Sequence, residues 1–432
     1  MEVPPPAAIL GRMQILILGA GVTGLCAAYA LARDGHAVSI VERNPEAARE
    51  SSFANGGQLS YSYVAPLAGP GVIPKIPGWL LKSDSPMRFR PRLDPAQWRW
   101  GLKFLAACTP AMADLTTRRL LRLSALSRRL VHGLVEEEGL DFAYSRTGKL
   151  VVLSDQASFD AARALMGYQA TLGCTQEALD AAEVLRLEPA LARIAPRLVG
   201  GIHTPDEEAG DCRAFCLGLS RILTRRYGVT FHWGTPVREL VAQGGRLRAA
   251  MVPAGAMEAD AFVLAAGAAA AGLLRPLGVS LPLYPLKGYS LTVPIARDDA
   301  APRISVTDAA RKTVYARLGD RMRVAGMADL VGHDTSIWPD RLDLLVREAR
   351  AAFPDCSDWS RIGPWTGLRP ATPTGAPILG ACPGLANLML NVGQGALGFT
   401  LAMASGQVVA DALAGRPAPI EMDGFQPADH GL

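Results

Sequence analysis

The 432-residue chain has few cysteines, few histidines and few charged side chains, and their distribution argues against several classes of protein. The seven cysteines form an odd set with no CxxC pair, which disfavours a disulfide scaffold, an iron–sulfur cluster and a structural zinc. The six histidines lack metal-ligand spacing and no nucleophile motif of a hydrolase occurs, so no metal site is predicted. Only 19% of residues are charged, and the net charge of +4 argues against a chain-wide nucleic-acid binder.

Targeting and membrane-spanning signals are also weak. The first eight residues lack the basic-then-apolar order of a signal peptide, and residues 1–12 are predicted to be a disordered leader. The 41 residues between Arg369 and Asp411 carry no charge, but prolines and amides interrupt them before about 20 apolar residues accumulate. We therefore predict a buried strand, loop and helix there. With 49% apolar residues, the chain is expected to form two interlocked domains.

A complete β-α-β unit begins the chain after the leader. A short apolar run at 14–18 is followed by Gly19, Gly21 and Gly24, a helical pattern, and a second apolar run at 37–41 that ends at Glu42. Gly19 permits a tight turn, Gly21 lets the backbone approach a pyrophosphate, and Gly24 allows the helix and strand to pack closely. Glu42 is placed to accept hydrogen bonds from ribose hydroxyls, and its charge disfavours NADP. The unit predicts dinucleotide binding and leaves NAD and FAD open.

Two further segments favour FAD. A small, polar and glycine-rich loop follows the second strand and suits wrapping of the phosphates and the flavin edge, with candidate contacts at Arg43, Asn44, Ser51, Gly57, Gln58 and Leu59. Near the C-terminus, an apolar strand at 388–392 leads into Gly393, Gln394, Gly395, Ala396, Leu397 and Gly398 and then a helix at 399–410. A helix N-terminus beside the ring favours the negative charge that develops on flavin reduction. The alternative is an ordinary glycine-rich connection.

These segments, together with Pro285–Ser290 and Trp365–Pro370, resemble the FAD-dependent D-amino-acid oxidase superfamily, most closely its bacterial D-amino-acid dehydrogenases. The resemblance runs from about Met13 to the end of the chain. It implies an α/β fold in which a Rossmann-like FAD-binding domain (13–60, 205–280 and 361–432) is interleaved with an α+β substrate domain built on an antiparallel sheet (61–204 and 281–360). It also implies cofactor contacts at Val237, Ala266 and Gly267. Gln394 stands where close relatives often carry His, which puts the substrate preference in doubt.

The resemblance further implies oxidation of D-amino acids to imino acids, which water converts to a keto acid and ammonia. Arg369 is the candidate anchor for the substrate carboxylate, because a guanidinium binds carboxylates bidentately. Tyr289, Tyr315, Lys287, Gln58 and Gln394 are further candidates for contacts to substrate or flavin, although tyrosines often serve packing and Lys287 suits a solvated turn. The alternatives are a glycine-, sarcosine- or hydroxyproline-type enzyme of the same superfamily, an NAD-dependent enzyme, and a non-catalytic flavoprotein that docks to membranes.

One stretch is strongly basic. Between residues 75 and 129 the net charge is +9, against −5 for the rest of the chain, and Trp79, Trp98 and Trp100 fall in the same stretch. Basic residues mixed with tryptophan suit the interface of an anionic membrane, whereas a solvated face with core tryptophans is the alternative. We predict a cytoplasmic protein, peripheral on the inner membrane, that passes electrons to a quinone or another respiratory acceptor.

Overall fold

The computed structural model describes residues 11–76, 78 and 85–432. Its first sheet has six strands in the order β19 (Ile378–Ala381), β20 (Leu388–Val392), β13 (Ala261–Leu264), β1 (Gln14–Leu18), β2 (Ala37–Val41) and β9 (Thr230–His232). All neighbours are parallel except β19 and β20. The predicted β-α-β unit is therefore present, and its first strand lies inside a parallel sheet.

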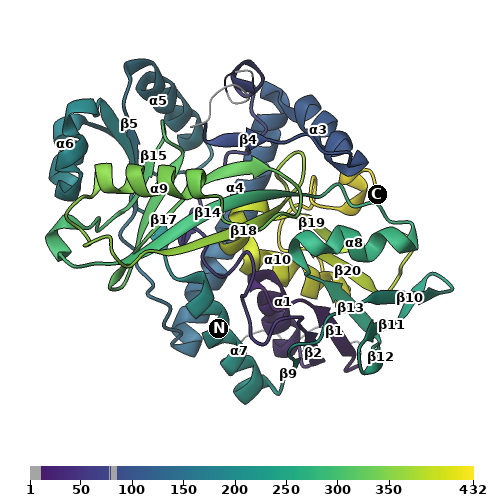
Figure 1. Cartoon of the computed structure of the whole chain (residues 1–432). Helices are drawn as coiled ribbons and strands as arrows, with labels where there is room; N and C mark the ends of the chain where they lie inside the picture. Colours follow the sequence, from purple (N-terminus) through teal and green to yellow (C-terminus); the bar gives the residue numbers. More distant parts are fainter. Residues whose placement is uncertain (1–10, 77, 79–84) are drawn as a thin grey trace.

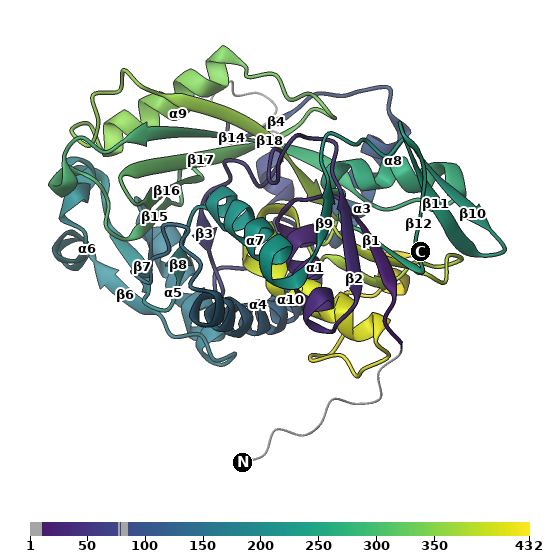
Figure 2. The ribbon, with the colours of Figure 1, turned by 90° about the horizontal axis from the view of Figure 1, so that it is seen from below.

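Both faces of this sheet are covered, which explains why its strands are apolar throughout. On one face, side chains such as Ile15 and Ile17 pack against α1 (Val22–Arg33), α7 (Cys212–Tyr227) and α10 (Gly398–Leu413). On the other, Leu16 and Leu18 pack against a three-stranded sheet of β10 (Glu239–Gln243), β11 (Arg246–Val252) and β12 (Gly255–Glu258), and against α8 (Ala270–Leu274). Figure 2 shows α1 beside α10 and α7. The parallel sheet is thus the middle layer of a sandwich.

The second sheet has nine strands, most of them antiparallel. Its order is β18 (Gly363–Ala371), β14 (Tyr284–Pro294), β17 (Arg321–Leu330), β16 (Thr313–Leu318), β15 (Ser305–Asp308), β5 (Lys149–Leu153), β7 (Gly200–Thr204) and β6 (Glu177–Asp180), with β4 (Met87–Phe89) on β17. The pairs β5–β15 and β4–β17 are parallel. Helix α9 (Pro339–Ala352) covers one face (Figure 1), while α5 (Gln156–Ala170) and α6 (Ala181–Leu187) lie at the β5–β7 end. The predicted substrate-domain sheet is thus present.

Two segments do not follow the predicted division of the chain. β18 belongs to the nine-stranded sheet, although its residues were predicted to lie with the FAD-binding segments. Helix α4 (Pro110–Glu138) falls within the predicted substrate segment, yet its side chains pack with α10 and α1. Thr109 caps the N-terminus of α4 and Gly139 ends it in a left-handed conformation, so this long helix is specified locally. Strand pairing and helix packing therefore cross the sequence boundaries.

The long uncharged stretch near the C-terminus forms strands, a loop and a helix, as predicted. Residues Gly395–Leu413 are long and apolar enough to cross a membrane by composition, but 67% of that window is buried inside the protein. The predicted leader lies largely outside the described residues, which begin at Gly11. A small two-stranded sheet of β3 (Gln58–Leu59) and β8 (Glu208–Ala209) and the helix α3 (Pro95–Ala107) complete the elements used below.

Candidate functional site

Two of the three fingerprint glycines, Gly19 and Gly24, occupy positions that only glycine suits. Gly19 has φ +111°, and a Cβ there would lie 2.7 Å from the carbonyl oxygen of Ala265. A Cβ on Gly24 would collide with the carbonyl oxygen of Gly19, so this glycine allows α1 to pack on the β1 turn. By contrast, a Cβ on Gly21 would find nothing nearer than Ser52 Oγ at 3.6 Å. The space beside Gly21 fits a group that approaches the backbone closely, as a pyrophosphate does.

Glu42 lies at the end of β2 and its carboxylate faces the glycine turn. Glu42 Oε2 accepts a hydrogen bond from the backbone N–H of Ala20 at 2.8 Å, and Oε1 accepts from the backbone and side chain of Asn44.

The chain after β9 returns to the same strand end, where Thr235 N–H donates to the Glu42 carbonyl at 2.7 Å. Val237 follows and packs on the core cluster that contains Val41. Arg43 is half exposed and pairs with Glu50. Glu42, Asn44 and Val237 therefore flank one strand end, as a nucleoside site requires.

The predicted cofactor loop connects the two sheets. Ser52 Oγ accepts from Val22 N–H at the start of α1 at 3.1 Å, and Ser51 Oγ donates to the Leu368 carbonyl of β18 at 2.5 Å. Gly57 has φ +67° and packs against Leu318 and Gly210. Gln58 and Leu59 form β3. The loop is therefore held at both ends, between the glycine turn and the nine-stranded sheet.

Three parallel strands end beside one another at this edge. β1 leads into Gly19, β13 into Ala266 and Gly267, and β20 into Gly393. Gly267 and Gly393 have φ +52° and +88°, and a Cβ on Gly393 would lie 2.7 Å from Thr372 Cγ2. Gly395, Ala396 and Leu397 form a turn of 3-10 helix before Gly398 begins α10, without a side-chain cap. Carboxyl ends of parallel strands are where nucleotides bind in such sheets, so these residues fit FAD.

Gln394 has a structural role in this loop. It is 3% exposed, its Nε2 donates to Asn391 Oδ1 at 2.7 Å, and Asn391 Nδ2 in turn donates to the Thr23 carbonyl in α1. Gln394 also forms an antiparallel bridge with Ala371 at the end of β18. These contacts connect three elements and occupy the amide nitrogen. They favour positioning of the loop over the predicted contact with substrate.

Arg369 lies on β18 on the sheet face that points toward the cofactor loop. Its neighbour across the strand pair is Leu286, and its guanidinium lies over Gly288, where a Cβ would collide with it. Arg369 Nη1 donates to the Met327 carbonyl at 2.7 Å, and no carboxylate of the described residues lies within 4 Å. Burial lowers the pKa of this guanidinium, and Asp329 partly opposes that effect. A partly buried cation without an ion-pair partner fits an anchor for a substrate carboxylate.

The predicted roles of Lys287, Tyr289 and Tyr315 do not fit this geometry, because these side chains lie on the opposite face of the sheet. Residues on a strand alternate between faces, and Lys287 and Tyr289 are out of phase with Gly288. Tyr289 and Tyr315 belong to the core cluster beneath α9, and Tyr315 OH donates to the Glu348 carbonyl in α9. Lys287 is fully buried and its Nζ lies 3.4 Å from Asp334 Oδ2. We interpret all three as structural residues.

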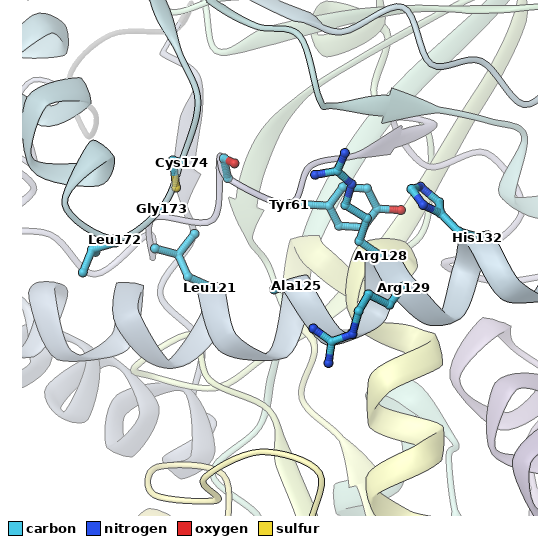
Figure 3. Close-up of a pocket in the computed structure, with 10 residues that line it drawn as sticks. Tyr61, Leu121, Ala125, Arg128, Arg129, His132, Leu172, Gly173 and Cys174 are labelled. Carbon is cyan, nitrogen blue, oxygen red and sulfur yellow. The ribbon is translucent and has the colours of Figure 1, made fainter. Parts of the chain in front are cut away.

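Sequence reasoning missed a group of buried charges beside the cofactor loop. Lys149, Glu207 and Glu208 are 2%, 1% and 2% exposed and surround residues 58–63. Nearby, a pocket of about 380 Å³ is lined by one face of α4, including Arg128, Arg129 and His132, and by Tyr61, Ser62 and Cys174. Figure 3 shows the Tyr61 hydroxyl pointing toward His132. These residues are scattered between positions 58 and 208, so no local sequence motif identifies them.

Six of the seven cysteines are buried, and Cys174 is partly exposed. Cys212 and Cys216 are buried on one face of α7, beside Cys26 in the same core cluster. No group of three or more His, Cys, Asp or Glu side chains in the described part of the chain is arranged to hold a metal ion. Cys212 and Cys216 therefore act as small core residues.

Only part of the basic stretch is a surface. Trp100 is 5% exposed and its Nε1 donates to the Ala371 carbonyl, so it is a core residue, whereas Trp98 is 50% exposed. Trp79, Lys82 and Asp84 lie outside the described residues. Arg88 pairs with Asp340, and Arg90 stacks on Trp338 at 3.9 Å. Of the exposed basic residues in the described part of the stretch, Arg99 and Lys103 lie on α3, Arg90 and Arg92 precede it, and Arg118 and Arg129 lie on α4.

Comparisons with known proteins agree with this geometry. The family model described as FAD dependent oxidoreductase matches residues 14–412. The chain is 52% identical to D-amino acid dehydrogenase 2 of Ralstonia nicotianae (94% of this chain, 97% of the relative) and 50% identical to D-amino acid dehydrogenase 2 of Pseudomonas aeruginosa (96% and 98%). Among solved structures, glycine oxidase from Geobacillus kaustophilus is similar with a TM-score of 0.76 at 21% identity (96% and 98%). At such identity, the last likeness concerns the fold.

Proposed function

The chain belongs to the family of FAD-dependent oxidoreductases, and from that premise we propose that it oxidises D-amino acids as a dehydrogenase. The observation that carries the proposal is the Arg369 guanidinium, which lies flat against Gly288 with no carboxylate of the described residues within 4 Å. Two relatives, at 52% and 50% identity, carry the name D-amino acid dehydrogenase 2.

The residues of the chain have separate tasks in this reaction. Gly19, Gly21, Gly24 and Glu42 bind the dinucleotide, and the 51–59 loop with the 393–398 loop encloses the ring. FAD held by these residues would supply the acceptor for the hydride that leaves the substrate Cα when the substrate amine is uncharged. Arg369 binds the substrate carboxylate in two hydrogen bonds and so fixes the orientation of the Cα–H bond. Gly288 leaves room for the Arg369 guanidinium and Gly367 leaves room for the Trp365 ring, because a Cβ at either position would collide with that side chain.

Anaerobic reduction by a substrate panel tests the proposal. The purified yellow protein is mixed with D-amino acids, their L-enantiomers, glycine, sarcosine and D-proline, and the visible flavin absorbance is followed. We expect several D-amino acids to bleach it, with a keto acid and ammonia as products. Faster bleaching by glycine or sarcosine than by any larger D-amino acid would instead assign the chain to the glycine-oxidising branch.

The acceptor and the membrane surface belong to the same proposal. Trp98, Leu102 and Leu105 lie at i, i+4 and i+7 on α3 and are 50%, 68% and 40% exposed, so they form one apolar face. Arg99 and Lys103 lie beside them and are also exposed. Apolar side chains flanked by basic ones suit an anionic bilayer, where each basic residue contributes about 1 kcal/mol. The protein is thereby peripheral on the inner membrane and passes electrons to a quinone there.

Vesicle binding tests this surface. The double variant Trp98→Ala, Leu102→Ala is expected to lose most of its sedimentation with vesicles rich in phosphatidylglycerol, while dye-coupled turnover stays unchanged. Leu165→Ala on α5 is the matched control, because Leu165 is 43% exposed and lies away from α3. Equal binding of both variants, or oxygen as the preferred acceptor with rapid peroxide formation, would contradict the docking and quinone proposals respectively.

A further inference from the structure

Three buried charged side chains hold the end of the predicted cofactor loop and the residues that follow it. This segment comprises residues 58–63, which begin with β3 and end beside the pocket of Figure 3. Lys149 approaches it from the start of β5, and Glu207 and Glu208 approach it from the chain that pairs with β3. All three charges are at most 2% exposed.

The hydrogen bonds and the cation–π contact of the Lys149 ammonium all fall on this segment. Nζ donates to Gln58 Oε1 at 3.0 Å and to Ser60 Oγ at 2.9 Å, and it lies 4.0 Å from the centroid of the Tyr63 ring. No carboxylate of the described residues lies within 4 Å of it, and burial lowers the pKa of the ammonium, an effect that Glu207 only partly opposes. An ammonium has three donors, and here they serve two side chains and one ring face of the same six residues.

The two acids hold the other side of the segment. Glu207 Oε1 accepts from the backbone N–H of Ser62 at 2.6 Å, and Glu208 Oε2 accepts from Tyr61 OH at 2.9 Å. Glu208 Oε1 lies 2.5 Å from His132 Nε2 at the wall of the pocket. The segment is therefore fixed by a cation on one side and by two carboxylates on the other.

Fold stability does not account for this arrangement. Burying an ammonium without an ion pair costs free energy, and apolar replacements of buried charges are often neutral or stabilising. The position of the segment offers a reason. It begins directly after the left-handed turn at Gly57 and includes the last two residues of the cofactor loop, and Ser60 N–H donates to Thr400 Oγ1 in the first turn of α10. The segment thus lies between the two loops that enclose the flavin.

We propose that Lys149 is a positioning residue of the flavin site, which fixes residues 58–63 so that the cofactor loop keeps the shape that binds FAD. The inference rests on the proposed cofactor loop and deepens it. Lys149 itself is too deeply buried to touch the substrate, so its influence passes through Gln58 and Ser60.

The test compares holoenzymes of Lys149→Met, Lys149→Gln and Lys149→Arg with the wild type. Measurements are the visible flavin spectrum, the flavin midpoint potential and FAD dissociation followed by ultrafiltration. We expect Lys149→Met to weaken FAD binding at least tenfold and to shift the flavin absorbance bands and the potential. Lys149→Arg keeps the charge and donors and should restore most of the wild-type properties. Lys312→Met, in the turn between β15 and β16, controls for the loss of one lysine.

A wild-type spectrum, potential and FAD affinity in both Lys149→Met and Lys149→Gln would overturn the proposal. If one of these variants does not fold, the other decides. Failure of this proposal can be distinguished from failure of the proposed function. In the second case the wild-type protein would bind FAD normally, but no D-amino acid would reduce the flavin. The FAD measurements do not depend on that result.

Discussion

Replacing Lys149 by methionine should change how the stability of the protein depends on pH. Burial lowers the pKa of the Lys149 ammonium from 10.5 to about 8, and Glu207 only partly opposes this. The folded protein therefore bears a free-energy cost of about 3 kcal/mol for holding this charge at pH 7, since each pH unit of difference corresponds to about 1.4 kcal/mol.

The direction in which stability changes with pH follows from proton binding. Between pH 8 and 10.5 the unfolded chain retains the proton that the folded protein has lost, so wild-type stability rises with pH by about 1.4 kcal/mol per unit from this group. Lys149→Met lacks this contribution. At pH 7 the variant no longer bears the cost of the buried charge. This gain in stability is offset because Gln58 Oε1 and Ser60 Oγ lose their hydrogen-bond donor, which costs about 1–3 kcal/mol each. That loss does not vary with pH, so the slope separates the two effects.

The assay is urea unfolding of the two proteins in parallel at half-unit steps from pH 7 to 10, with saturating FAD. Relative to the variant, the wild type should gain about 2 kcal/mol between pH 8 and 10. Lys312→Met, analysed in the same way, should follow the wild type. Parallel pH dependences for the wild type and Lys149→Met would show that Lys149 titrates normally and would refute the reasoning about its burial.

Three further substitutions test the site. Gly24→Ala should abolish FAD retention, measured as flavin released on gel filtration, because its Cβ would collide with the Gly19 carbonyl; full retention would contradict the packing. Arg369→Lys should lower kcat/KM for D-amino acids by tenfold to a hundredfold, since it loses one of two charged hydrogen bonds worth about 1.5–3 kcal/mol, while FAD binding stays unchanged. Gly288→Ala should displace the Arg369 guanidinium and raise KM more than it lowers kcat, and a wild-type KM would indicate that the guanidinium is free to move.

The nucleotide half of the site was predictable from sequence because its parts are local. Gly19, Gly21, Gly24 and Glu42 lie within 24 residues, and each has a backbone or hydrogen-bonding reason that is visible in the spacing. The resemblance also implied the largely antiparallel sheet of the second domain, which the structure contains.

What sequence reasoning could not give was the face on which each strand residue lies. Arg369 and Tyr289 are both on buried strands of one sheet, but only the register of β14 with β18 shows that they point to opposite sides. The Lys149 cluster escaped notice for a related reason, because Gln58, Lys149 and Glu207 are brought together by tertiary contacts between separate strands. Long-range register is set by the whole hydrophobic pattern, so single motifs do not report it.

The central claim is that this flavoenzyme oxidises D-amino acids bound through Arg369, and anaerobic stopped-flow reduction of the wild-type flavin tests it most directly. We predict that D-alanine or another D-amino acid of the panel bleaches the visible flavin band in a saturable manner, that the L-enantiomer does not, and that the rate falls sharply in Arg369→Lys. A flavin that dithionite reduces but that no D-amino acid of the panel reduces would contradict the account.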